Sequence, residues 1–142
     1  MSSSAIAVPF YEKPTGSVSS YDVEGDLSAL MNTFVQLDTS RARCVKAWAS
    51  GMPIGVLTNA PSEDATSAGF SLTATVQKSG VALVKAGSGG LALDDLVKVD
   101  TGGVGVKATP TTGDIIVGKC VFAAAQNGIA SVELFKAFYA SA

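Results

Sequence analysis

The stretch FVQLDT at residues 34–39 recurs, with conservative changes, as LVKVDT at residues 96–101. Three shorter matches follow along the chain: VKA at 45–47 with VKA at 106–108, IG at 54–55 with VG at 117–118, and ATV at 74–76 with ASV at 130–132. In the first three of these four matches, the second copy follows the first by 62, 61 and 63 residues. Differences of one residue in turn length account for this variation. The pattern indicates a weak internal duplication, with two units of similar structure.

Each unit is predicted to consist of strands and turns. Val97 and Val99 alternate with Lys98 and Asp100, which is typical of a strand with one buried face. The Asp-Thr pair that ends each first strand favours a turn, because a short Asp side chain bonds to its own backbone. Residues 81–84 are predicted to form a further strand between the units. Such a chain favours one small, closed or nearly closed β-barrel, because closure hides the edges of Val-rich strands.

The chain is expected to divide into an extended N-terminal arm, residues 1–25, and a single barrel-like domain, residues 26–142, with an aromatic C-terminal tail. Pro9, Pro14 and Gly16 interrupt the arm, and proline disfavours helix at its own position and at the preceding one. Residues 26–31 have the apolar spacing of a short helix, with Asp26 as a plausible N-cap. The predicted fold class is therefore all-β, with at most one short helix.

The composition excludes several classes of active site. The 142 residues include no histidine, which removes Ser-His-Asp and Cys-His nucleophiles and histidine-ligated zinc. Cys44 and Cys120 are too few for a structural zinc site and are expected to be buried hydrophobes. With 10 Lys+Arg against 12 Asp+Glu, the chain lacks the basic surplus of nucleic-acid binders, and no apolar run is long enough to span a membrane. We expect no enzyme, no catalytic, cofactor-binding or metal-binding residues, and no nucleic-acid or membrane partner.

Three motifs have a simpler explanation than ligand binding. Residues 103–108 match the letters of a G-x-G-x-x-A dinucleotide fingerprint, but Pro110 and Gly113 exclude the helix that this fingerprint requires. The acidic pairs at 63–64 and 94–95 are predicted to be solvated loops. Arg41, Arg43 and Lys46 form a basic cluster that either solvates a tight turn or contacts an acidic partner surface.

Six of the ten aromatic residues lie near the two ends of the chain. Aromatic side chains contribute strongly to the energy of interfaces, so both ends are candidates for docking on other surfaces. The arm is expected to dock on the chain's own body or on a neighbouring chain, and its candidate contact residues are Val8, Phe10 and Tyr11. The C-terminal candidates, for a subunit interface or for capping the barrel, are Phe135, Phe138 and Tyr139.

The pattern of small residues and turns between about residues 34 and 135 resembles one known family. It includes PIGVLTNAP at 53–61, VQKSGVALVKAG at 76–87, DLVKVD at 95–100, VGVKAT at 104–109, GDIIVG at 113–118 and AAAQNGIASVEL at 123–134. These stretches resemble the head decoration, or capsid cement, proteins of tailed bacteriophages.

The resemblance implies a structural role without an active site or a cofactor. Such proteins bind the outside of an expanded capsid and stabilise the contacts between major capsid protein subunits. The expected partner is therefore the major capsid protein. The arm residues Val8, Phe10 and Tyr11 are expected to contact the capsid or a neighbouring subunit. The resemblance also implies a homo-oligomer, with a trimer favoured over a dimer. We expect synthesis in the host bacterial cytoplasm and a final location on the capsid exterior of the virion.

An alternative hypothesis is a receptor- or glycan-binding β module of a virion fibre. Carbohydrate binding usually requires an exposed aromatic ring on which a sugar can stack, and Trp48 is the only tryptophan in the chain. A small hydrolase or cofactor enzyme is disfavoured because the catalytic groups listed above are missing.

Overall fold

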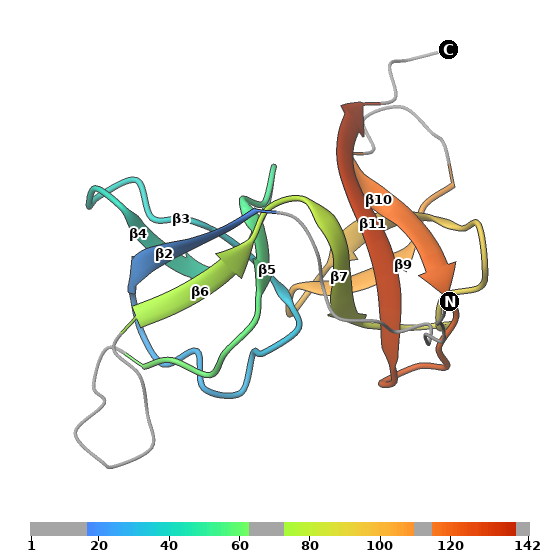
Figure 1. Ribbon diagram of the computed structural model, residues 1–142, viewed down its shortest axis with the longest axis horizontal. Coiled ribbons are helices and arrows are strands. Elements are labelled where there is room, and N and C mark those ends of the chain that lie inside the picture. Colours follow the sequence, from blue (N-terminus) through green and yellow to red (C-terminus); the bar gives the residue numbers. More distant parts are fainter. Residues whose placement is uncertain (1–16, 63–72, 110–114, 139–142) are drawn as a thin grey trace, which may run out of the picture.

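The computed structural model describes residues 17–62, 73–109 and 115–138, with side chains to Phe135. The described residues contain strands and turns and no helix, which confirms the all-β prediction. Consequently, none of them forms a helix long and apolar enough to cross a membrane. Figure 1 shows two groups of strands side by side, with the chain passing from the first to the second through the turn before β7.

The first group is a closed barrel and the second is a five-stranded sheet. The barrel has the strand order β2-β4-β3-β5-β6, with β2 at Val18–Val23, β3 at Phe34–Leu37, β4 at Cys44–Ala47, β5 at Gly55–Leu57 and β6 at Thr73–Gln77. The sheet has the order β7-β11-β10-β8-β9, with β7 at Gly80–Lys85, β8 at Leu96–Asp100, β9 at Val104–Lys107, β10 at Ile115–Phe122 and β11 at Ile129–Phe138. Barrel closure, the second part of the fold prediction, is thus also confirmed.

The two groups have the same topology, strand for strand. The antiparallel pairs β3–β4, β3–β5, β5–β6 and β6–β2 correspond to β8–β9, β8–β10, β10–β11 and β11–β7. The parallel pair Val23–Val45, which closes the barrel, corresponds to a single parallel bridge between Ala86 and Gly105. The duplication therefore comprises whole five-stranded units, and the second unit curls until its edge strands meet at that bridge.

The loops that lead into β3 and β8 repeat each other in detail. Asn32 and Asp94 have positive φ angles of 71° and 70°, a conformation that Asn and Asp tolerate well. The Asn32 N–H donates to Leu57 O at 2.7 Å, and the Asp94 N–H donates to Cys120 O at 2.9 Å. Each loop is therefore bonded in the same way to the end of the glycine-containing strand of its own unit.

Gly55 and Gly118 account for the matched IG and VG dipeptides. A Cβ atom at Gly118 would lie 2.5 Å from Glu133 O and 2.6 Å from a Val132 methyl carbon, so only glycine fits. A Cβ at Gly55 would meet the equivalent backbone and valine atoms of β6. Both units thus keep glycine for the same close approach of two strands.

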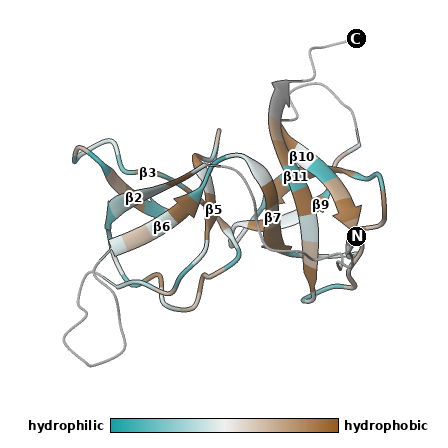
Figure 2. Ribbon diagram, viewed as in Figure 1, coloured by the Kyte–Doolittle hydropathy of each residue, from teal (hydrophilic) through white to brown (hydrophobic). Residues whose placement is uncertain are grey.

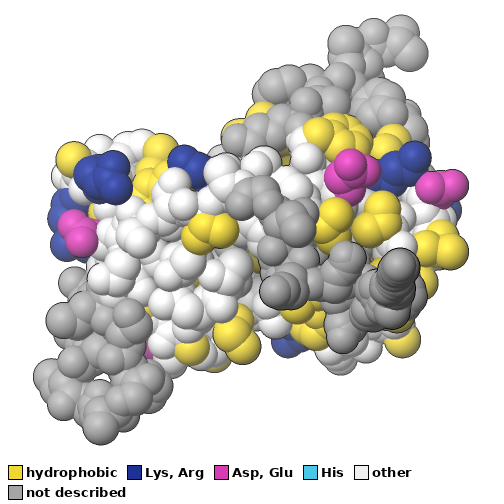
Figure 3. Space-filling view, in the orientation of Figure 1, with side chains coloured by type: hydrophobic (Ala, Val, Ile, Leu, Met, Phe, Trp, Pro, Cys, Tyr) yellow, Lys and Arg dark blue, Asp and Glu magenta, His cyan; other side chains and the backbone are white. Residues whose placement is uncertain are grey.

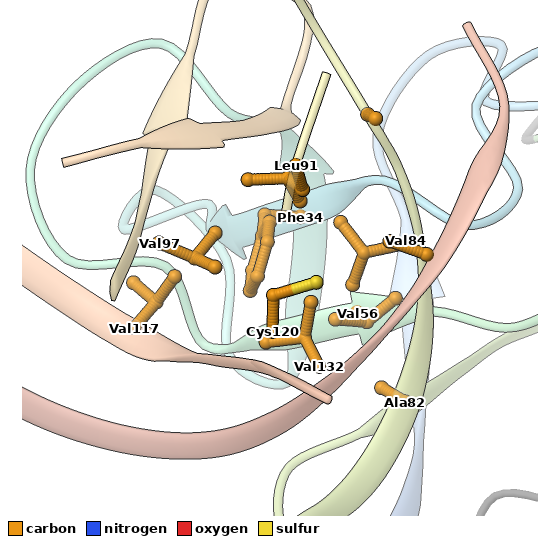
Figure 4. Packing of buried hydrophobic residues seen from close by; sticks show 11 residues of the cluster. Phe34, Val56, Ala82, Val84, Leu91, Val97, Val117, Cys120 and Val132 are labelled. Atoms are coloured by element: carbon orange, nitrogen blue, oxygen red, sulfur yellow. The ribbon is translucent and has the colours of Figure 1, made fainter. Parts of the chain in front are cut away.

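Each unit has its own hydrophobic cluster, but the first unit contributes to the second. Val35 and Leu57 point into the first barrel. Their neighbours Phe34 and Val56, which pair across β3 and β5, belong to the cluster of the second unit, where Figure 4 shows them among residues of β7, β8, β10 and β11. Strand alternation therefore gives β3 and β5 one face in each core. Figure 2 shows the corresponding mixture of hydrophobic and hydrophilic residues along the strands.

Three local features differ from the sequence interpretation. Residues 26–31 form turns and not a helix, and the Ser28 N–H donates to Asp26 Oδ1 at 2.9 Å. The VKA match is one residue out of structural register, because Lys46 pairs with Gln36 whereas Val106 pairs with Lys98. Residues 18–23 of the expected arm are extended but form strand β2 of the barrel, and residues 1–16 lie outside the described part of the chain.

Replacing Phe34 by Ala is expected to lower the free energy of unfolding by about 3–5 kcal/mol, because it leaves a cavity between the two units. Urea denaturation followed by far-UV circular dichroism measures this loss. The control is Leu37→Ala on the same strand, where the side chain is exposed and the expected change is within about 0.5 kcal/mol. Equal losses in the two variants would contradict the assignment of Phe34 to the core between the units.

Candidate interaction surfaces

The described residues contain no group of three or more His, Cys, Asp or Glu side chains that could hold a metal ion. In the acidic pair 94–95, Asp94 forms an ion pair with Lys119 at 3.5 Å and Asp95 with Lys107 at 3.9 Å. The second acidic pair, 63–64, lies outside the described residues. Most of the apparent dinucleotide fingerprint, residues 103–108, is strand β9 and the turn before it. Residues 94–95 and 103–108 therefore belong to the second unit.

Cys44 and Cys120 are free, fully buried thiols in different units. Desolvation by burial raises the pKa of both thiols. A hydrogen bond from Cys120 Sγ to Phe122 O, at 3.4 Å, does not offset that effect. Both residues act as small core hydrophobes, as the sequence predicted.

The basic cluster has an internal structural role. Arg41 Nη2 donates to Val23 O at 3.1 Å and lies 3.6 Å from Glu24 Oε1. Arg43 Nη2 donates to Ser20 O at 3.1 Å, and its guanidinium lies 5.8 Å from the centre of the Tyr21 ring. The two arginines therefore attach the β3–β4 hairpin to β2, next to the parallel pair that closes the barrel. This favours the turn interpretation over contact with an acidic partner.

A groove of about 260 Å³ lies between the two units, beside Trp48. It forms because the β8–β10 ladder ends at Val97–Gly118, beyond which the two strands separate. The β4–β5 turn of the first unit supplies the opposite wall, and the Trp48 indole N–H donates to Gly51 O at 3.0 Å, which fixes the ring. The residues that line the groove are Trp48, Gly51, Pro53, Lys98, Val99, Asp100, Ile115 and Val117.

The predicted contact residues at the two ends of the chain are only partly described. Phe135, on β11, is 42% exposed and lies beside Ile54 and Leu134 at the seam between the units. Phe138 ends β11 opposite Ile115, its side chain is not described, and Tyr139 lies outside the described residues. The roles of these three residues remain predictions.

The arm residues Val8, Phe10 and Tyr11 also lie outside the described part, but the place where the chain enters the barrel is defined. The Ser17 N–H donates to Ser79 Oγ at 2.9 Å, and Ser17 O accepts from the Lys78 N–H at 2.8 Å. Lys78 and Ser79 form the turn between β6 and β7. Ser17, which follows the first sixteen residues, therefore lies at the junction of the two units.

The second unit has an exposed apolar surface, the distal patch, which was not predicted from the sequence. Its members are Leu93, Val121, Phe122 and Ile129, which are between 40% and 64% exposed. Figure 3 shows hydrophobic side chains gathered over this unit, next to acidic and basic ones. Only an alignment of the two units reveals the patch in the sequence, because Thr58 and Asn59 occupy the positions of Val121 and Phe122.

No family model matches the chain, and no curated protein matches it in sequence. The solved structures that share its fold include two from phage heads. One is the head fiber gp8.5 N base of bacteriophage phi29, with a TM-score of 0.60 and 11% identity, covering 84% of this chain and 93% of that one. The other is a chain from the capsid of Myoviridae phage XM1, with a TM-score of 0.64 and 18% identity, covering 84% of this chain and 82% of that one.

The fold thus occurs in phage heads. The sequence resemblance to phage head proteins is confirmed at the level of the fold. Structural similarity at 11% and 18% sequence identity shows a shared fold.

The thiols of Cys44 and Cys120 are expected to resist a disulfide reagent in the folded protein at mildly alkaline pH. Burial blocks access, and the raised pKa values keep both groups protonated, whereas the thiolate is the reactive form. Absorbance of the released thiol measures the reaction, and the same chain in denaturant, where both thiols should react quickly, is the control. Rapid labelling of the folded protein would show that a unit opens locally.

Proposed function

We propose that this chain is a structural protein of a phage virion that binds the outer surface of the expanded capsid. There it would stabilise the contacts between major capsid protein subunits, without enzymatic activity. The likeness of fold to a phage head fibre base and to a phage capsid chain is the observation that carries the proposal. The pattern of small residues and turns that resembles decoration proteins agrees with it.

The architecture suits such a role. The closed barrel and the five-stranded sheet form one body, because Phe34 and Val56 of the first unit lie in the core of the second. A capsid offers many copies of one binding site, so modest contacts by each copy add up over the shell. The arm would supply the capsid contact through Val8, Phe10 and Tyr11, starting from the anchored Ser17.

The proposal includes a homo-oligomer, with a trimer favoured, located on the capsid exterior. The C-terminal residues Phe135, Phe138 and Tyr139 would contribute to a subunit interface or cap the second unit. The exposure of Phe135 at the seam is compatible with either role.

Co-sedimentation with expanded, undecorated heads of the phage from which the chain derives tests the proposal. Saturable binding at a fixed ratio to the major capsid protein is the expected result, and that ratio indicates the oligomer. A folded protein that stays in the supernatant at all concentrations would contradict the proposal.

Deleting residues 1–12 is expected to abolish capsid binding and to leave the body folded. The deletion removes all three proposed contact residues but keeps the bonds of Ser17 and the whole of strand β2. Co-sedimentation measures binding, and circular dichroism confirms the fold. A full-length chain with Val8→Ser, Phe10→Ser and Tyr11→Ser is the matched variant, which should bind as weakly as the deletion. Undiminished capsid binding by both variants would remove the arm from the proposal.

The groove at Trp48 supports a second candidate function, a glycan-binding module of a virion fibre. An aromatic ring fixed on one wall, with Lys98 and Asp100 on the opposite wall, combines a stacking surface with groups that can bond to sugar hydroxyls. The distribution of polar and apolar groups, and not the groove volume alone, favours this candidate.

If the groove binds a glycan, adding bacterial surface polysaccharide to the protein should change the Trp48 fluorescence in a saturable way. The variant Asp100→Ala removes one polar group of the groove and should weaken the response about tenfold, without changing the unliganded spectrum. The exposed Glu24→Ala variant, on the first unit, is the control and should respond like the unaltered chain. An absence of any fluorescence response would contradict glycan binding at the groove.

A further inference from the structure

The outer surface of β7 and β11 combines apolar side chains with a buried hydroxyl group. The two strands lie side by side (Figure 1), and alternate residues, among them Ala82 and Val132, point into the core of the second unit. The residues between them point outward in three cross-strand pairs: Val81 with Glu133, Leu83 with Ser131, and Lys85 with Ile129. Paired residues on one side of a sheet are direct neighbours, so these six side chains form one surface, the β7–β11 face.

The hydroxyl group of Ser131 has no hydrogen-bond partner among the described residues. Ser131 is only 1% exposed, although it points away from the core of its own unit. A buried polar group that forms no hydrogen bond destabilises a protein, and such groups normally have a partner. The hydroxyl therefore indicates that a further polar group belongs on the β7–β11 face.

The first unit shows that the fold does not require apolar residues on this face. Alignment of the matched ATV and ASV stretches places Ser20 at the position of Leu83 and Thr73 at the position of Ile129. Ser20 and Thr73 are both exposed. The same backbone is thus stable with polar residues at these two positions. Apolar residues there are suited to a segment that packs on the face from outside.

The N-terminal end of the described chain lies beside the start of this face. The Ser17 N–H donates to the hydroxyl of Ser79, the residue before β7. Strand β2 runs from this point along β6, and Figure 1 shows that β2 begins on the side of the second unit. A chain continued backwards from Ser17 in the direction of β2 therefore passes over the start of β7.

The length of the N-terminal segment fits the length of the face. Lys85 follows Ser79 by six residues, and Tyr11 precedes Ser17 by six residues. Six residues of extended chain span about 20 Å. An extended segment that runs antiparallel to β7 therefore brings Tyr11 level with Lys85 and with its cross-strand partner Ile129.

The charges of the segment agree with this register. Glu12 would lie next to Lys85, and Lys13 would lie closer to the end of the face that carries Glu133. Charges of opposite sign would thus be close at both ends of the face. Pro14 suits a segment that lies on a face, because such a segment needs no continuous ladder of main-chain hydrogen bonds.

We propose that residues 8–16 lie extended on the β7–β11 face of their own chain, antiparallel to β7. Phe10 and Tyr11 would pack beside Ile129, and a main-chain group of the segment would bond to the Ser131 hydroxyl. The face would cover these aromatic residues until they leave it to contact another surface. The proposal does not depend on capsid binding, because its test uses the purified chain without capsids.

An engineered disulfide tests the position of the segment. Tyr11→Cys with Ile129→Cys should form an intrachain disulfide under mild oxidation, identified by mass spectrometry and non-reducing electrophoresis. The matched control is Tyr11→Cys with Thr73→Cys. Thr73 precedes Ser79 by six residues, so it is as far along the chain from that anchor as Lys85, but it lies on the first unit. The control should form the bond at least about tenfold more slowly, because a disulfide requires Cα atoms within about 7 Å.

Proteolysis of the unaltered segment provides an independent measurement. Chymotrypsin cleaves after Phe10 and Tyr11 when the segment is accessible, and mass spectrometry follows the released peptide. Leu83→Ser with Ile129→Thr copies the first unit and should keep the fold. We expect this double variant to be cleaved about tenfold faster, because the rate follows the population of undocked segment. The control Leu37→Ser replaces an exposed residue of the first unit and should be cleaved like the unaltered chain.

The variant Ser131→Ala tests the proposed hydrogen bond. It should also be cleaved faster than the unaltered chain, because its loss of the hydroxyl weakens the docked state. Circular dichroism and urea midpoints verify that each variant is folded. Equal rates of disulfide formation in the two cysteine pairs, or unchanged cleavage in the double variant, would overturn the proposal. Disulfide-linked dimers in place of the intrachain product would overturn it too, because the segment would then lie on another copy.

Discussion

The contact of Phe34 and Val56 with the second unit is the interaction on which the rest of the structure depends. The edge strands of that unit, β7 and β9, meet only at the bridge between Ala86 and Gly105, and the first unit reaches both sides of this narrow closure. The Phe34 N–H donates to Gly103 O in the β8–β9 turn at 2.8 Å, and the Lys85 N–H on β7 donates to Asn32 O at 2.8 Å. Apolar burial and main-chain bonds thus act at the same place, so the second core is complete only when the first unit is folded against it.

The two units share a backbone plan but use their outer faces differently. The first places Phe34 and Val56 on the outside of its barrel, where they join the units, and the second has Leu96 and Lys119 at the equivalent positions. Lys119 pairs with Asp94 and so keeps that face polar. Four exposed apolar residues of the second unit, Leu93, Val121, Phe122 and Ile129, form the distal patch instead. Duplication therefore produced one body with three distinct regions: an internal joint, a distal patch, and the anchored start of the arm, through which we propose that the body contacts a capsid.

The sequence was sufficient for the parts of the fold that depend on local pattern. The repeated FVQLDT and LVKVDT stretches, the alternating valines and the matched glycines predicted strands, turns and a duplication correctly. Strand β2 was not recognised, because its residues VSSYDV are mostly polar and only Tyr21 and Val23 are buried. The VKA match was misplaced by one residue, because the match was made on identical residues and the turns before them differ in length. The turn has five residues in the first unit (39–43) and three in the second (101–103). The candidate surfaces were harder still: Leu93 and Phe122 are separated in sequence, and exposure has no signature in a single residue.

The sequence by itself determined the strand content, the repeat and the lack of histidine-dependent chemistry, because these follow from residue types and from their spacing along the chain. Only the tertiary structure decided that each repeat curls on itself, that Arg41 and Arg43 attach a hairpin to β2, and that Val56 belongs to the neighbouring core. The physical reason is that a strand residue has two faces, and the sequence shows which residues share a face but not what covers it. The partner of each face depends on contacts between residues that lie far apart in the chain, and those form only when the two units pack together.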